Sequence, residues 1–77
     1  MSSEEIKKQI DRLKTVKGNV KLVQKKMRLL HPSAKAAGKI YQWRADEVQE
    51  IIDKMMRSVD EEVTNLNKRL CQETATQ

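Results

Sequence analysis

The most reactive side chains in this 77-residue chain are its single histidine, His31, and its single cysteine, Cys71. Brought together, they could form a thiolate–imidazole pair for nucleophilic catalysis. Forty residues of mostly helical chain separate them, which at about 1.5 Å per residue places them about 50 Å or more apart. Such a pair cannot form within one chain, so we expect no catalytic residue and no enzyme activity.

Acidic residues of the second half are the next candidates, as ligands of a metal ion. Asp46, Glu50 and Asp53 are spaced by four and three residues, which places them on one face of a helix. The sequence lacks both the Glu-x-x-His pattern of di-metal helical bundles and the Asp-rich loop of calcium sites. Gly18 and Gly38 do not form a phosphate-binding loop. We therefore expect no metal, no cofactor and no small-molecule substrate.

Basic residues recur every seven positions in the first half of the chain. Residues 1–31 carry nine Lys or Arg and three Asp or Glu, whereas residues 40–77 carry five and eight. A helical row of cations about 10 Å apart can neutralise a nucleic-acid backbone without reading its bases. No aromatic residue is interleaved with these lysines to stack on bases, so phosphate contacts are the expected mode. The candidate phosphate-binding residues are Lys7, Lys14, Lys17, Lys21, Lys25 and Arg28.

The same charges also have a purely structural interpretation. Asp46, Asp53 and Asp60 recur every seven residues, so acidic and basic rows could approach each other within a hairpin or between chains. Surface ion pairs of this kind keep a helical bundle soluble and fix the orientation of its helices, with little energy per pair. Binding to a membrane surface is disfavoured because the basic half has no Trp or Phe to anchor in the interface.

Local signals predict where the first helix begins and ends. Ser2 followed by Glu5 is a capping-box pattern, and acidic residues there favour the positive end of the helix dipole. Pro32 lacks the amide hydrogen that would continue the helix and disfavours helical geometry in the residue before it. We therefore expect the first helix over about 3–30.

The remaining boundaries follow from the same residues. We expect a turn over about 31–37, which could be shorter because Pro32 suits the first position of a helix. The second helix is expected over about 38–72, and the last residues, 73–77, show no apolar period and are expected to fray. Residues 1–77 would thus form a single helical-hairpin domain.

Heptad rows in the two halves fit each other in reverse. When they are paired so that residue numbers sum to 68, apolar residues meet along the whole length. We therefore predict an all-α fold, an antiparallel two-helix coiled-coil hairpin. The rows of the first helix are Ile6, Leu13, Val20, Met27 and Gln9, Val16, Val23, Leu30; those of the second are Gly38, Ala45, Ile52, Val59 and Tyr41, Val48, Met55, Glu62.

Apolar residues outside this seam indicate a protein partner. In the expected register the second helix overhangs from about residue 65 onward, with no first helix opposite. Other apolar residues lie on outward positions, and Trp43 is the best single candidate. Two helices alone bury little surface, so we expect a twofold dimer that forms a four-helix bundle. The candidate interface residues are Leu22, Leu29, Ile40, Trp43, Ile51, Met56, Val63, Leu66, Leu70 and Cys71.

Composition favours an intracellular interaction protein. The chain is 35% charged and has one Pro and two Gly, which suits long exposed helices better than a deep core. Glu4 and Glu5 stand where a secretory signal would be basic and then apolar, and a lone cysteine suits a reducing, cytoplasmic compartment. We predict a self-associating adaptor, assembly or regulatory protein that binds a second copy or another helical protein. The alternative is a nucleic-acid-binding helical bundle that uses the basic face of its first helix.

Overall fold

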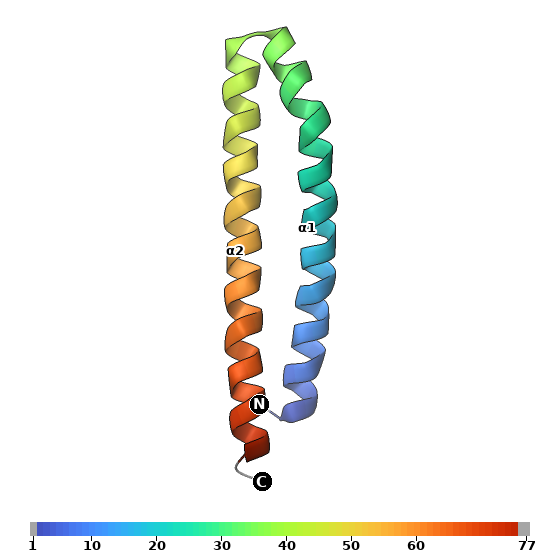
Figure 1. Ribbon diagram of the computed structural model, residues 1–77, viewed down its shortest axis with the longest axis vertical. Helices are drawn as coiled ribbons and strands as arrows, with labels where there is room; N and C mark the ends of the chain where they lie inside the picture. The colour runs from blue at the N-terminus through green and yellow to red at the C-terminus, as the bar shows by residue number, and fades with distance from the viewer. Residues whose placement is uncertain (1, 76–77) are drawn as a thin grey trace.

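Two antiparallel helices make up the part of the chain that the structure, a computed structural model, describes, residues 2–75. Helix α1 (Ser3–Ala37) and helix α2 (Lys39–Ala75) run side by side, with Gly38 alone between them (Figure 1). The molecule measures 59 × 15 × 13 Å, so it is a rod with the chain reversal at one end, the tip, and both termini at the other, the open end. The expected all-helical antiparallel hairpin is confirmed.

The N-terminus of α1 is capped as its sequence predicts. The Ser2 hydroxyl accepts a hydrogen bond from the Glu5 amide at 3.3 Å, and the Ser2 carbonyl accepts one from the Ile6 amide at 3.1 Å. Glu4 and Glu5 lie in the first turn, where the helix dipole stabilises negative charge. These contacts satisfy amides that would otherwise have no partner within the helix.

The C-terminal end of α1 differs from expectation, because the helix continues through Pro32 to Ala37. Pro32 is exposed, so the carbonyl that loses its amide partner lies on the side open to water. The residues that follow include three alanines, the best helix formers, and Ala34 is buried at 7% exposure. Helix α1 curves toward α2 in this segment (Figure 1). The expected helix end near residue 30 and the turn over 31–37 are therefore wrong.

Gly38 reverses the chain direction in a single residue. Its φ of 135° and ψ of 169° lie in a region that is essentially confined to glycine. Its amide donates to the Ala34 carbonyl at 3.2 Å, and its carbonyl accepts from the Gln42 amide at 3.1 Å. The second helix then runs to Ala75, so residues 73–75 are helical rather than frayed, and residues 76 and 77 lie outside the described part of the chain.

The position of the reversal sets the register of the two helices. A pivot at Gly38 pairs residues whose numbers sum to about 76, whereas the expected turn centred on residue 34 required a sum of 68. Side-chain contacts across the hairpin follow the new register, so the predicted register is wrong. These contacts join Ser3 to Glu73, Lys17 to Asp60, Gln24 to Asp53, and His31 to Asp46, with sums of 76 or 77.

The new register also changes which heptad rows face each other. The rows that begin at Ile6 and at Gly38 lie in the seam as predicted, with Ile6 fully buried and Gly38 half-buried. In each helix this row is flanked by two other heptad rows, one on either side. In both helices the flanking row that lies in the seam is not the one that was predicted. The second seam row of α1 is Ser3, Ile10, Lys17, Gln24 and His31, and that of α2 is Gln42, Gln49, Met56, Val63 and Leu70.

Packing is tightest at the open end of the hairpin. Ile6, Ile10 and Leu66 form a buried cluster with exposures of 0, 5 and 2%, and Leu13, Val63 and Leu70 pack against it. The predicted overhang of the second helix is therefore wrong, because α1 covers that segment. Toward the tip the seam narrows to the small residues Ala34 and Ala45, which are 7% and 3% exposed.

The two glycines of the chain give a test of the hairpin geometry. Apart from the adjacent residues and the backbone of the same helix, no heavy atom lies within 4 Å of where a Cβ would stand at Gly18 or Gly38, so a clash with a packed neighbour is not involved. Gly38→Ala should lower the free energy of unfolding by about 1–3 kcal/mol because of its backbone conformation. Gly18→Ala, inside α1, should raise it by about 0.5–1 kcal/mol. Urea unfolding followed by far-UV circular dichroism measures both, and changes of the same sign would contradict this turn.

Candidate protein-interaction surface

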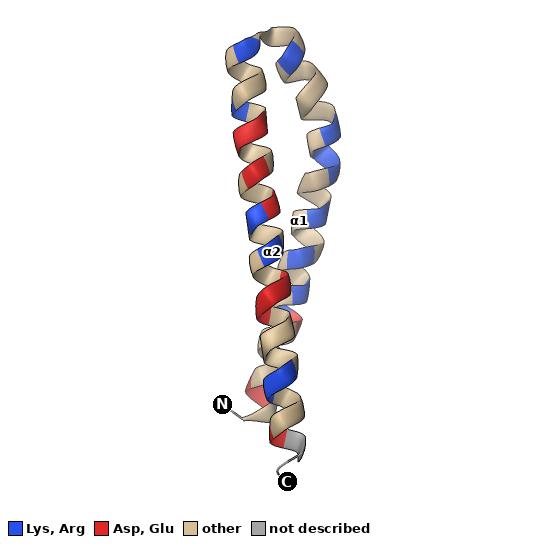
Figure 2. Cartoon of the chain, turned by 60° about the vertical axis from the view of Figure 1, so that its left-hand side comes forward, with Lys and Arg blue, Asp and Glu red and all other residues tan. Residues whose placement is uncertain are grey.

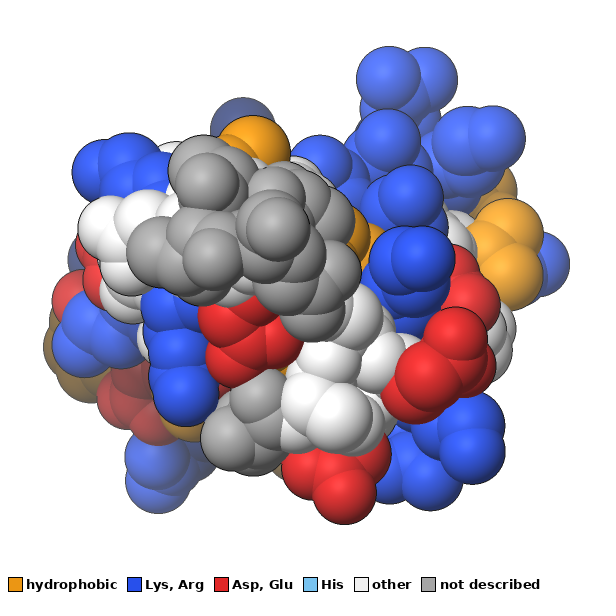
Figure 3. Space-filling view, turned by 90° about the horizontal axis from the view of Figure 1, so that it is seen from below, with side chains coloured by type: hydrophobic (Ala, Val, Ile, Leu, Met, Phe, Trp, Pro, Cys, Tyr) orange, Lys and Arg blue, Asp and Glu red, His pale blue; other side chains and the backbone are white. Residues whose placement is uncertain are grey.

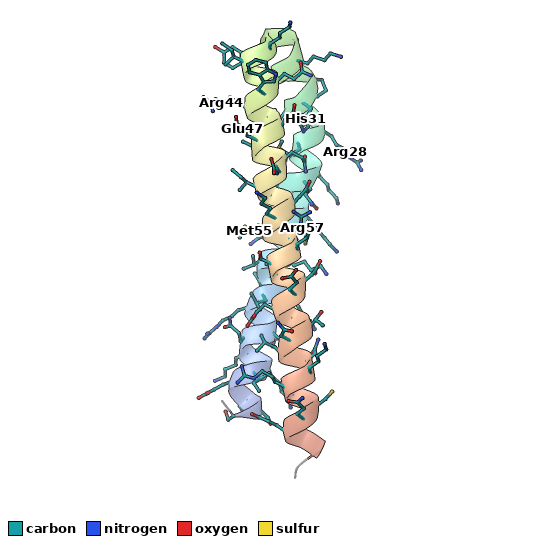
Figure 4. The ribbon with its side chains drawn as sticks, turned by 90° about the vertical axis from the view of Figure 1, so that its left-hand side faces the viewer. Arg28, His31, Arg44, Glu47, Met55 and Arg57 are labelled. Carbon is teal, nitrogen blue, oxygen red and sulfur yellow. The ribbon has the colours of Figure 1, made fainter. Side chains whose placement is uncertain are left out.

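The two long sides of the hairpin differ in chemistry. Figure 4 shows Arg28 and His31 directed to one side and Arg44 and Met55 to the other. The first side carries hydrogen bonds and ion pairs between the helices, and we call it the polar flank. We call the second side the apolar flank, which comprises Val16, Val23, Leu30 and Ala37 of α1 and Tyr41, Val48 and Met55 of α2.

Ionic and amide contacts cross between the helices along the polar flank. Lys17 Nζ lies 2.7 Å from Asp60 Oδ1, and the two side chains are 38% and 49% exposed. One heptad nearer the tip, Gln24 Nε2 donates to Asp53 Oδ1 at 3.4 Å, and Gln49 Nε2 donates to the same oxygen at 2.9 Å. These polar side chains of the seam thus have partners within the hairpin. Lys17, a candidate phosphate-binding residue, is held in such a contact.

His31 ends this ladder near the tip. Its Nε2 lies 3.4 Å from Gln49 Oε1 and its Nδ1 lies 3.7 Å from Asp46 Oδ1, and the His31 side chain is about one-third exposed. Cys71 lies near the C-terminal end of α2, at the opposite end of the rod. The fold therefore keeps the histidine and the cysteine of one chain apart.

A basic edge follows α1 beside the polar flank. It continues past the predicted row to Lys35, which lies in α1 rather than in the expected turn. Lys and Arg segments recur along α1 in Figure 2, and Lys and Arg side chains gather on the α1 side of the molecule in the view from the open end (Figure 3). Lys25 is also exposed and lies beside this edge, four residues after Lys21 and three before Arg28. The basic edge consists of Lys7, Lys14, Lys21, Arg28 and Lys35, all exposed.

The apolar flank is a contiguous apolar surface that the hairpin leaves open. Five of its large side chains, Val23, Leu30, Tyr41, Val48 and Met55, are 41–60% exposed. They border two shallow hollows between the helices, of about 340 and 360 Å³. From residue 16 to residue 37 the flank extends about 32 Å along α1. Toward the open end the same rows continue with the polar residues Gln9, Glu62 and Arg69.

The structure divides the predicted interface residues into two groups. Leu22, Leu29, Ile40, Trp43 and Ile51 are exposed by 58–68% and lie on outward positions of both helices. Four others are used inside the hairpin: Leu66 is buried, and Met56, Val63 and Leu70 are half-buried in the seam. Cys71 is exposed.

The predicted register places the rows of Val23 and Val48 in the seam, so it does not predict the apolar flank as a surface. The signal that could have revealed it lies in the polar rows. Lys17 and His31 are two heptads apart, as are Asp60 and Asp46, and pairing them requires the register of the structure. That register turns the row of Val23 outward.

Other kinds of site and comparisons with known proteins add no functional assignment. Within residues 2–75, no group of three or more His, Cys, Asp or Glu side chains could hold a metal ion. No helix in this range has an apolar stretch long enough to cross a bilayer. No protein-family model, curated protein or solved structure matches the chain.

Reversing the charges of one cross-helix pair tests the register. Lys17→Glu or Asp60→Lys alone should lower the free energy of unfolding by up to about 1 kcal/mol, because like charges then face each other at a half-exposed position. The double variant should regain most of that loss, and high salt should reduce all three differences. Chemical denaturation of the four proteins measures the coupling. Additive effects of the two substitutions would show that these side chains do not meet.

Proposed function

We propose that this chain is a non-enzymatic protein-interaction module whose apolar flank binds helices of another chain. The observation that carries this proposal is the continuous row of large apolar side chains, 41–60% exposed, on one side of the hairpin. Soluble monomers rarely expose contiguous apolar patches of more than a few hundred Å². Covering this flank removes apolar surface from water at about 25 cal/mol per Å².

The shape of the flank suits helices in particular. Its side chains stand at seven-residue intervals on two antiparallel helices, and the hollows between them are shallow. A helix laid along such a surface inserts its own side chains between these rows, as in four-helix bundles. The outward residues Leu29, Ile40 and Trp43 are more exposed but lie on other sides of the helices, so they do not form the centre of this surface.

Site-specific photo-crosslinking tests the proposal. A benzophenone amino acid in place of Tyr41, within the flank, should form crosslinks to a protein chain when the variant is expressed in its source cells. The same amino acid in place of Leu29, which is 68% exposed but outside the flank, is the matched control and should form few. Denaturing gels and mass spectrometry identify the products. Equal crosslinking from both positions, or none from position 41, would contradict the proposed surface.

A second candidate function is phosphate binding by the basic edge. Its five cations recur every seven residues on α1 and lie on the side away from Met55 and the apolar flank. Both surfaces are therefore open to different ligands at once. Cations spaced by about 10 Å along a rod suit an extended polyanion, and affinity from such contacts falls steeply with salt.

Charge reversal tests whether the basic edge binds phosphates or only provides charged surface in contact with water. The triple variant Lys14→Glu, Lys21→Glu, Arg28→Glu should lose at least about tenfold in nucleic-acid affinity and show a smaller salt dependence. The control carries the same change of net charge on α2, Lys54→Glu, Arg57→Glu, Lys68→Glu, and should retain most of the binding. Fluorescence anisotropy at several salt concentrations measures both. Similar losses in the two variants would leave only a net-charge effect and reject the edge as a site.

A further inference from the structure

We infer that the apolar flank binds a second copy of this chain, with the tips of both hairpins at the same end and α1 of each copy over α2 of the other. This inference rests on the proposed function of the apolar flank and names its occupant. Two identical flanks packed face to face are related by a twofold axis that runs either along the hairpins or across them. The first axis places the tips together, and the second places them at opposite ends.

The area of contact favours the arrangement with the tips together. Along the full 35 residues of α1, a face about 52 Å long and about 15 Å wide covers about 800 Å² per copy. That equals the contribution of each partner to an interface of standard size. With the tips opposed and the flanks aligned, the open ends project beyond the partner, and the contact shrinks to about 500 Å² per copy. This smaller contact is at the lower limit for a specific interface.

The distribution of charge favours the same arrangement. Residues 1–31, most of α1, carry nine basic and three acidic side chains, and residues 40–77 carry five and eight. An axis along the hairpins stacks α1 on the partner's α2, so helices of opposite net charge face each other. An axis across the hairpins instead stacks α1 on the α1 helix of the partner. Lys26, near the middle of the flank and exposed, would then face a second Lys26.

Two pairs of opposite charge complete the contact toward the open end. Within one hairpin, residues whose numbers sum to 76 lie at the same height along the long axis. A twofold axis along the hairpins does not change these heights, so a residue of α1 also lies level with the corresponding residue of the partner's α2. Arg12 then lies within about 3 Å, in height along the axis, of Glu62 of the partner subunit, and Glu5 within about 3 Å of the partner's Arg69. All four side chains are exposed. Glu62 and Arg69 continue the flank row of α2, and Glu5 and Arg12 lie in the row of α1 that borders the flank. Apolar surface thus meets apolar surface near the tips, and opposite charges meet at the open ends.

Two measurements on the full chain test the arrangement. Light scattering should give a mass near 18 kDa, twice the 9.0 kDa chain. A spin label on the single, exposed Cys71 reports the orientation. With the tips together the two labels should lie about 30 Å apart, whereas opposed tips would separate them by about 65 Å. Val48→Glu should reduce the mass to that of the monomer with the helical content retained, and Leu29→Glu, outside the flank, should leave the dimer intact.

Charge exchange tests the pairs at the open end. Arg12→Glu or Glu62→Arg alone should raise the dimer dissociation constant about tenfold, since each substitution places like charges at two symmetric positions. The double variant should return to within about twofold of the original value. Sedimentation equilibrium at low salt measures the constants. If the double variant is as weak as the single ones, these residues do not face each other across the interface.

The outcomes separate this inference from the function on which it rests. A chain that stays monomeric at high concentration overturns the inference, while crosslinks from position 41 to a different protein would keep the interaction module. A dimer with the long label distance overturns the arrangement with the tips together. A dimer that survives Val48→Glu places the contact outside the apolar flank and contradicts both.

Discussion

Chain reversal at Gly38 is the constraint on which the rest of this structure depends. Because one residue with a φ of 135° suffices for the turn, α1 extends to Ala37 and α2 begins at Lys39. The helices then have 35 and 37 residues and nearly equal lengths, so the open end closes with Leu66 packed against Ile6. A turn of seven residues would have left the second helix without a partner at that end. The register, the packing and the surface chemistry all follow from this pivot.

Polar contacts in the seam decide which of two heptad rows of α1 faces the second helix. Val16, Val23 and Leu30 would fill an interface with more apolar side chains than Lys17, Gln24 and His31, which actually line it. The polar residues are acceptable there because each contacts a carboxylate of α2 and remains partly exposed to water. The more apolar row is left on the surface, where a hairpin by itself cannot cover it.

This division gives the two flanks different roles. The polar flank joins the helices to each other and fixes their register, since its contacts require particular pairs of residues. The apolar flank carries the surplus of apolar surface, and the proposed function follows from the free energy gained when another chain covers it. The basic edge lies beside the polar flank, so a partner on the apolar flank would leave its cations in contact with solvent. Self-association and binding of a polyanion are therefore compatible in one molecule.

Signals that are local or periodic could be interpreted from the amino acids alone. The Ser2 cap, the two long helices, their antiparallel pairing and the seam row of Ile6 depend on neighbouring residues or on a seven-residue repeat, and the structure contains all of them. The end of α1 at Ala37 depended instead on packing of Ala34 against the second helix, which offsets the cost of Pro32. The outward direction of Val23 depended on the register, and no local sequence signal specifies that register because it is set by contacts between residues tens of positions apart.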